Sequence, residues 1–246
     1  MTSILNASAY KFVALSNTVQ WRESIRSQAT GHALRGTVLL AEEGINLSVA
    51  GAESGVRGFL AWLGASEVFA DLAIKESWCD AQPFGRLIVK IKPEIIRMNQ
   101  PAIRPQAGRA PAVDARTLAR WLDAGVDDDG RAVIMLDARN DFEVDAGRFT
   151  GALDWRLCKF SDFPSALREH RDELEGTTVV SYCTGGIRCE KAALLMRESG
   201  LADVLQLDGG ILAYLAQVGG KHFDGHCFVF DERVMLNDTL IPTHSV

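Results

Sequence analysis

Residues 179–191 read Val-Val-Ser-Tyr-Cys-Thr-Gly-Gly-Ile-Arg-Cys-Glu-Lys, and this stretch decides the fold that we expect for the second half of the chain. It runs from an apolar segment into a glycine turn that opens a helix, with Cys183 at the apex of the turn. Such a turn bends back so that successive backbone N–H groups face one point, and the helix adds the positive end of its dipole there. We therefore predict that Cys183 is a nucleophile at the end of a strand.

The surroundings of Cys183 are expected to favour its thiolate form. Loop N–H groups, a helix dipole and the cation of Arg188 together lower cysteine pKa values from ~8.5 toward ~3.5–7.5. The backbone donors belong to Thr184, Gly185, Gly186 and Ile187. Arg188 stands one residue closer to the cysteine than in cysteine phosphatases, so the smaller ring of donors suits the terminal sulfur of a persulfide better than a phosphate. A buried structural cysteine is the alternative, and the glycines, the arginine and the helix start argue against it.

Length and composition predict a water-soluble protein of two domains. The chain has 246 residues, of which 47% are hydrophobic and 24% are charged. No apolar run reaches the ~18 residues of a membrane span. The first residues lack the basic start and long apolar core of a secretory signal, so we expect a cytoplasmic protein whose five cysteines stay reduced.

Residues 1–92 are expected to form a ferredoxin-like, that is acylphosphatase-like, α+β domain. Their hydrophobic pattern follows the order β-α-β-β-α-β. Strands are predicted at 10–15, 34–40, 45–49, 72–76 and 87–91, and helices at 19–29 and 54–63, the second of them capped by Ser54.

Residues 93–113 hold four prolines and are expected to be a linker without a regular helix or a central strand. Residues 114–220 alternate as in an α/β domain with a parallel sheet. Strands are predicted at 132–136, 178–182 and 204–207, and helices at 114–124, 161–174, 189–199 and 210–218, with Asp114 as the first cap. Residues 221–246 remain as a C-terminal extension.

Charge is distributed unevenly along the chain. The net charge is −6, yet residues 86–120 carry eight cations against Glu94 and Asp114. Lys90, Lys92 and Arg97 are therefore candidate contacts for a phosphate backbone. A basic but merely solvated linker is the alternative, and the sequence leaves both open.

The chain resembles the rhodanese superfamily, and more closely the bacterial rhodanese-domain proteins of the tRNA uridine hydroxylase family. In the second half the resemblance is carried by Leu-Asp-Ala-Arg-Asn-Asp-Phe-Glu-Val at 136–144, by the loop at 183–191, by Asp-Gly-Gly-Ile-Leu-Ala-Tyr-Leu at 208–215 and by Cys-Phe-Val-Phe-Asp-Glu-Arg-Val at 227–234. Glu-Gly-Ile-Asn at 43–46 and Gln-Pro-Phe-Gly-Arg at 82–86 match that family's own N-terminal domain. The second half is thus expected to be a rhodanese-like domain.

The resemblance implies oxygen-dependent conversion of uridine to 5-hydroxyuridine at the wobble position of tRNA. It implies Cys183 as the reactive thiolate or persulfide, tRNA as partner and molecular oxygen as co-substrate, without an evident cofactor. The alternative is a sulfurtransferase that carries sulfane sulfur on Cys183, and a third hypothesis is a non-catalytic RNA-binding module. His222, His226 and Cys227 are spaced like metal ligands but lack a second ligand pair, so no metal is expected.

Several other residues have either a functional or a structural interpretation. Cys189 either resolves a persulfide or sulfenate on Cys183 or packs inward at the helix start. Asp137, Arg139 and Asn140 follow a predicted strand and are candidate substrate contacts, but we favour a structural salt bridge that pairs Arg139 with Glu143 or Glu190. Of the aromatic side chains, Trp78, Trp155, Phe160 and Phe163 are the candidates for base stacking, although we favour core positions for them.

Overall fold

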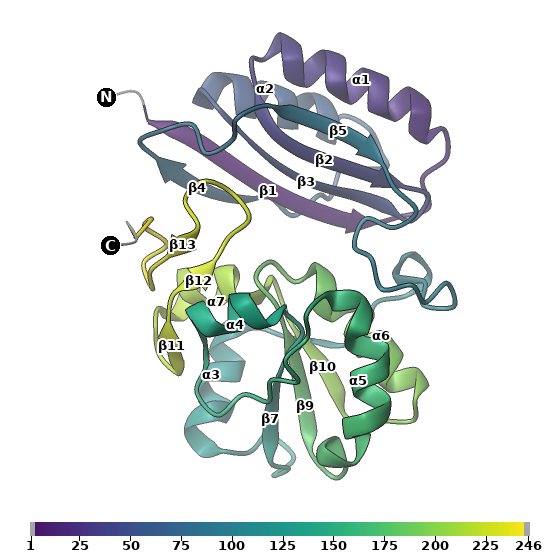
Figure 1. Ribbon diagram of the computed structural model, residues 1–246, viewed down its shortest axis with the longest axis vertical. Coiled ribbons are helices and arrows are strands. Elements are labelled where there is room, and N and C mark those ends of the chain that lie inside the picture. Colours follow the sequence, from purple (N-terminus) through teal and green to yellow (C-terminus); the bar gives the residue numbers. More distant parts are fainter. Residues whose placement is uncertain (1–2, 244–246) are drawn as a thin grey trace. The chain divides into compact units, whose positions relative to one another are not determined.

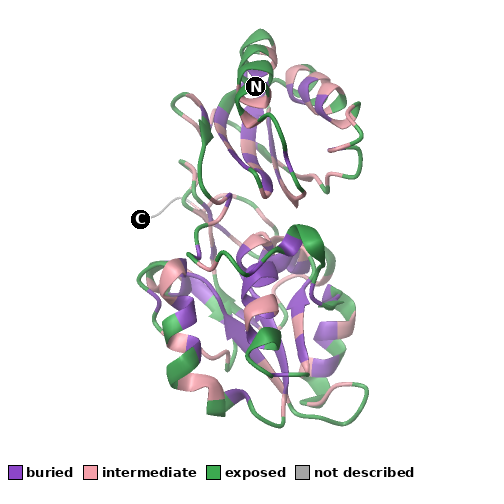
Figure 2. Ribbon diagram, turned by 90° about the vertical axis from the view of Figure 1, so that its right-hand side faces the viewer, coloured by how far each residue is buried: buried purple, intermediate pink, exposed green. Residues whose placement is uncertain are grey.

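The structure, a computed structural model that describes residues 3–243, holds one large sheet in each of two units (Figure 1). The first unit runs to Arg97 and takes in Asp231–Arg233. The second unit runs from Met98 to Phe230 and resumes at Val234. Each unit has a hydrophobic core of its own, and most strand residues of the two sheets are buried (Figure 2).

The first unit is a five-stranded mixed sheet with two helices on one face. Its strands are β1 (Ile4–Phe12), β2 (Arg35–Ala41), β3 (Gly44–Gly51), β4 (Lys75–Cys79) and β5 (Leu87–Ile91), in the order β4-β1-β3-β2-β5. Only β2 and β5 run parallel. The helices are α1 (Thr18–Gly31) and α2 (Glu53–Gly64). The ferredoxin-like prediction is therefore confirmed.

Three details of the first unit correct the prediction. The strand expected at 72–76 runs over Lys75–Cys79, and strand β1 begins at Ile4 rather than at residue 10. The inward positions in the first part of β1 are Leu5, Ala7 and Ala9, and the two alanines give only a weak alternation in hydrophobicity. Helix α2 begins at Glu53 with Ala52 in the cap position, so Ser54 is not the cap. The acidic side chain of Glu53 in the first turn suits the helix dipole without a capping hydroxyl.

The second unit contains a four-stranded parallel sheet in the order β6-β10-β9-β7. Its strands are β6 (Ala112–Val113), β7 (Val133–Asp137), β9 (Thr178–Tyr182) and β10 (Val204–Leu207), and its helices are α3 (Ala115–Ala124), α4 (Asp141–Ala146), α5 (Phe163–His170), α6 (Ile187–Glu198) and α7 (Gly210–Val218). Short 3-10 turns are η1 (Pro105–Ala107), η2 (Phe160–Asp162) and η3 (Arg171–Leu174). The predicted parallel sheet is confirmed, and so is Asp114 as the cap of α3, since its Oδ1 accepts the N–H groups of Arg116 and Thr117 at 3.0 Å.

Several elements of the second unit differ from the prediction. The helix expected at 161–174 is split into η2, α5 and η3, with Pro164 in the first turn of α5. Strand β6 lies inside the stretch assigned to the linker, at the edge of the sheet. Helix α4 was not predicted. Neither were the short strands β8 (Gly147–Phe149) and β11 (Phe223–Gly225), which pair with each other, or β12 (Cys227–Phe228) and β13 (Met235–Leu236), which form a second pair.

Within residues 3–243, no helix has the length and apolar character that a bilayer crossing requires.

Candidate active site

Cys183 directly follows β9, which lies between β7 and β10 in the parallel sheet. Gly186 has φ +99, a left-handed conformation that glycine adopts without strain, and it starts α6 at Ile187. The helix thus begins two residues earlier than predicted, because the glycine itself occupies the cap position. This places the loop at the carboxyl end of the strands, where open α/β sheets bind ligands.

The loop surrounds the Cys183 sulfur with hydrogen-bond donors. The Gly186 N–H donates to Cys183 Sγ at 3.1 Å, and the N–H groups of Arg188 and Cys189 also point at the sulfur. Burial alone raises the pKa of the Cys183 thiol, but the Cys189 side chain, the Arg188 charge and these N–H groups outweigh it and lower the pKa to about 5. Of the four predicted backbone donors, Gly186 is seen to donate to the sulfur, and the other two N–H groups at the sulfur belong to Arg188 and Cys189 in the first turn of the helix.

Cys189 lies close to Cys183, but the pKa of its thiol is shifted in the opposite direction. Its sulfur is 3.9 Å from Cys183 Sγ and 2.9 Å from the carbonyl oxygen of Gly186. Burial, followed by the neighbouring Cys183, raises the pKa of the Cys189 thiol well above its ordinary value. The proton of the pair consequently stays on Cys189. Both cysteines have 0% exposed surface, so a substrate reaches either sulfur only if the surrounding side chains move.

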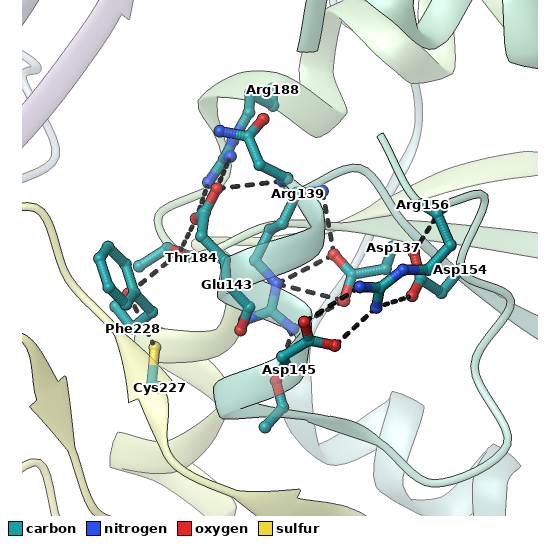
Figure 3. A network of polar contacts seen from close by, with 12 residues as sticks. Asp137, Arg139, Glu143, Asp145, Asp154, Arg156, Thr184, Arg188, Cys227 and Phe228 are labelled. Atoms are coloured by element: carbon teal, nitrogen blue, oxygen red, sulfur yellow. Dashed lines mark hydrogen bonds and ion pairs between the residues drawn. The ribbon is translucent and has the colours of Figure 1, made fainter. Parts of the chain in front are cut away.

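Arg188 is held by Glu143 in a buried, two-pronged ion pair (Figure 3). The two N–O distances are 2.5 and 2.7 Å, and Glu143 Oε1 also accepts the Thr184 hydroxyl at 3.3 Å. Glu143 belongs to α4, where its Oε2 also accepts the N–H of Asn140, the residue before the helix, at 3.1 Å. One carboxylate therefore ties α4 to two residues of the loop, and it balances the charge of Arg188 instead of leaving a free cation.

Asp137 and Arg139 form the expected salt bridge, with each other. Arg139 Nε donates to Asp137 Oδ1 at 2.9 Å and Nη2 donates to Oδ2 at 2.7 Å (Figure 3). The partner that we named for Arg139 is wrong, since Glu143 pairs with Arg188 and Glu190 pairs with Arg109. The reason is local: the Arg139 side chain turns back over two residues, where the Asp137 carboxylate already accepts the Arg139 N–H.

The same residues are poorly placed for substrate. Asp137 is 1% and Arg139 0% exposed, and Arg139 also donates to the carbonyl oxygen of Gly147 at 2.6 Å. Asn140 caps α4. These contacts brace the domain around the loop.

The candidate phosphate contacts belong to the other unit. Lys90 lies on the edge strand β5, and Lys92 and Arg97 follow it, all three of them exposed. Further along the basic stretch, Arg109 pairs with Glu190 and Asp208, and Arg120 pairs with Asp128. The structure thus does not bring Lys90, Lys92 and Arg97 together with Cys183 in one unit.

His222 and Cys227 are two of the three residues that are spaced like metal ligands. His222 Nε2 lies 3.0 Å from Asp123 Oδ1, and burial raises the pKa of the Cys227 thiol to about 12. Within the described part of the chain, no three His, Cys, Asp or Glu side chains are grouped as metal ligands are.

Sequence reasoning missed three phenylalanines beside the loop. Phe142, Phe228 and Phe230 form one cluster of ring contacts. Phe160 and Phe163 are core residues as favoured, but Trp78 is exposed and Trp155 is only half-buried, so the core position favoured for Trp78 is wrong. The signal was present in the quoted stretches 136–144 and 227–234, but neither stretch shows that its rings meet those of the other.

Comparisons with known proteins agree with this architecture. Residues 4–95 match the UPF0176 acylphosphatase-like domain and residues 118–217 match the rhodanese-like domain, which confirms both predicted domain types. A protein named tRNA uridine(34) hydroxylase from Variovorax paradoxus is 61% identical over 233 residues, covering 95% of this chain and 89% of the relative. One of the same name from Bordetella petrii is 59% identical over 246 residues, covering 100% of this chain and 98% of the relative. Among solved structures, the rhodanese-like domain of an Anabaena protein is 25% identical and covers 47% of this chain and 79% of that chain, with a TM-score of 0.39.

Proposed function

Since this chain belongs to the tRNA uridine(34) hydroxylase family, we propose that it converts uridine 34 of tRNA to 5-hydroxyuridine, with molecular oxygen as co-substrate and Cys183 as the reactive thiolate or persulfide. The observation that carries this proposal is the ring of N–H donors around Cys183 Sγ, in a chain that matches the B. petrii relative over its whole length. The donors stabilise negative charge on the sulfur, whether it belongs to Cys183 itself or to the terminal atom of a persulfide.

Hydroxylation requires two electrons besides the oxygen molecule. One oxygen atom enters the C5–H bond of uridine, and the other leaves as water after taking up two electrons and two protons. The Cys183 thiolate and the Cys189 thiol, 3.9 Å apart, supply the two electrons and one proton when they close to a disulfide, and solvent supplies the second proton. The balance is uridine, O2, the thiolate–thiol pair and one proton giving 5-hydroxyuridine, water and the disulfide, which a small cellular thiol reduces again.

This use of Cys189 is tested in a single turnover without added reductant. Wild-type protein is expected to form up to about one 5-hydroxyuridine per chain and to gain one disulfide, as two electrons per dithiol require. Cys189→Ser is expected to form none, although its Cys183 is still alkylated. Equal product from the variant would assign Cys189 to packing instead.

The function itself is tested by nucleoside mass spectrometry of tRNA from cells that lack paralogues. Cells with the wild-type protein are expected to contain 5-hydroxyuridine-derived wobble nucleosides, and cells with Cys183→Ala are expected to lack them. Cys158→Ala, which removes an exposed thiol of the same unit, is the matched control and should behave as wild type. Unmodified tRNA in the wild-type cells would reject the proposal.

Sulfur transfer is the second candidate, and the close fit of the donor ring to a single sulfur favours it. In this reaction the Cys183 thiolate attacks the outer sulfur of thiosulfate, forms Cys183–S–S⁻ and releases sulfite. Intact-mass measurement should then show one added sulfur atom that Cys183→Ala lacks. Sulfur loading in a protein that leaves tRNA unmodified would favour this candidate, and no loading would reject it.

A further inference from the structure

We propose that Phe142, Phe228 and Phe230, together the aromatic platform, bind a nucleobase of the tRNA anticodon loop by stacking while uridine 34 is presented to Cys183. This inference rests on the proposed function and adds a binding site for the substrate. It concerns the nucleotide that follows uridine 34 rather than the reacting base.

The platform exposes apolar surface that folding leaves uncovered. Phe230 is 64% and Phe142 is 44% exposed, and Phe228 is half-buried beneath them. The other phenylalanines of the described chain are buried or half-buried. Contiguous exposed aromatic side chains of this kind mark binding surfaces more often than chance exposure does.

The three rings are fixed in orientation by one another. Phe142 and Phe228 lie 5.1 Å apart at 80°, Phe228 and Phe230 lie 5.3 Å apart at 78°, and Phe142 and Phe230 lie 6.2 Å apart at 88°. In edge-to-face packing, each ring contacts its neighbour through its edge or through one of its faces. The exposed parts of Phe142 and Phe230 thereby have a fixed orientation, which suits a planar ligand.

The platform is continuous with the loop of Cys183. The Thr184 hydroxyl donates to the carbonyl oxygen of Phe228 at 3.4 Å, and the guanidinium carbon of Arg188 lies 5.9 Å from the centre of the Phe230 ring. Phe142 precedes Glu143, which holds both Arg188 and Thr184. Figure 3 shows Phe228 beside Thr184 and Glu143 at one end of this network.

A nucleobase fits this surface better than a protein does. Single-stranded RNA loops are recognised by stacking of unpaired bases on aromatic rings, and exposed rings of this kind stand here beside the loop of Cys183. Two partly exposed rings offer on the order of 200 Å². A stable protein interface needs roughly 800 Å² from each partner.

The test uses the full-length protein and an anticodon stem-loop RNA carrying 2-aminopurine after uridine 34. Phe230→Ala is expected to bind the RNA about tenfold more weakly than wild type and to lose the quenching of 2-aminopurine fluorescence that stacking produces. Phe230→Trp should keep both properties, whereas Phe230→Leu should behave as the alanine variant. Ile241→Ala, which trims another exposed apolar side chain of the same unit, should bind as wild type.

Failure of the aromatic platform and failure of the proposed function give different results. Equal binding and quenching by wild type and Phe230→Ala would overturn the platform, as would wild-type behaviour of Phe230→Leu. A wild-type dimer that Phe230→Ala converts to a monomer would also overturn it and assign the surface to a second copy of the chain. A wild type that binds and quenches but forms no 5-hydroxyuridine would overturn the proposed function alone. Equal alkylation of Cys183 in all variants shows that the loop is intact.

Discussion

The charge state of a single sulfur decides the chemistry at the residue scale. Loop N–H groups, Cys189 and Arg188 lower the pKa of Cys183 to about 5 against the effect of burial. A thiol with a lowered pKa is a thiolate above that pKa and gains its proton as the pH falls through it. Cys183 should therefore be a thiolate at neutral pH, whereas Cys189, with its raised pKa, should be a thiol.

This difference predicts the pH profile of alkylation. In a Cys158→Ala background, the iodoacetamide reaction at Cys183 is expected to keep its rate from pH 8 down to about pH 6 and to fall to half near pH 5. Mass spectrometry of the modified peptide measures the rate at each pH. A midpoint near ~8.5, the value of an ordinary cysteine, would contradict the thiolate.

The ion pair between Glu143 and Arg188 is predicted to matter for stability because it is buried. Glu143→Ala leaves the guanidinium without its partner in the interior and is expected to lower the free energy of unfolding by about 3–5 kcal/mol. Asp145 lies on the same helix as Glu143, and its ion pair with Arg156 is exposed. Asp145→Ala should therefore lower the free energy of unfolding by less than about 1 kcal/mol. Urea denaturation measures the free energy of unfolding of both variants. Equal decreases would show that the buried ion pair of Glu143 stabilises the fold no more than the exposed pair of Asp145 does.

At the scale of elements, the first turn of α7 packs against the loop. The N–H of Ile211 donates to the carbonyl oxygen of Cys183 at 2.9 Å, and that of Leu212 donates to Thr184 at 3.1 Å. This approach requires glycine at position 210, which has φ +68 and whose missing Cβ would lie 2.4 Å from the Cys183 carbonyl oxygen. The end of one helix thus sets the position of the reactive cysteine.

Gly210→Ala is accordingly expected to displace the loop. Its cost should exceed the ~1 kcal/mol of a left-handed alanine, because backbone atoms on the loop must also move. Gly125→Ala at the end of α3 has a similar φ of +73, in the left-handed region, but open space around it, so it should show the conformational cost alone. Thermal unfolding and the alkylation rate of Cys183 measure the two effects. If both variants lose equal stability and keep the rate, α7 does not position the loop.

Elements with strong local signals were predictable from the sequence, and those held by distant contacts were not. Strand β9 and helix α7 have the predicted bounds because an apolar run and a glycine pair mark them. Helix α4 has six residues, too few to show a helical repeat of hydrophobic side chains, and it is held by the contact of the Glu143 carboxylate with the Asn140 N–H and by the ion pair of Glu143 with Arg188. The strands β8 and β11 have three residues each and exist only as partners of each other.

Across the whole molecule, the contiguous part of the site could be read from the sequence and its long-range partners could not. The loop from Cys183 to Cys189 is one segment, so residue types and spacing predicted that backbone N–H groups face the sulfur, although of the predicted donors only Gly186 is among those found. The partner of Arg188 lies 45 residues away on an unpredicted helix. The basic stretch was equally ambiguous, because Arg109 is paired with Asp208, 99 residues away, which no local charge count reveals.

The remaining exposed cations allow a test of how an acidic chain binds tRNA. Lys90 on the edge strand β5 and Lys92 just after it face solvent, in a protein whose net charge is −6. Lysines also keep edge strands from pairing with other chains, so a protective role is the alternative to phosphate contact. The two roles predict different effects of removing the lysines. If they contact phosphate, the salt dependence of RNA binding changes, and if they protect the edge strand, self-association increases.

We expect the double variant Lys90→Gln/Lys92→Gln to bind unmodified tRNA more weakly at low salt and to reduce the slope of log K against log salt by about 1–2, since each phosphate contact contributes ~0.7–0.9. Lys159→Gln/Lys221→Gln removes the same charge from the other unit, where both lysines already pair with aspartates, and should leave the slope unchanged. Fluorescence anisotropy at several salt concentrations measures the slopes. An equal change in both variants would reduce the effect to net charge, and an unchanged slope with new oligomers in size-exclusion chromatography would assign the lysines to edge protection.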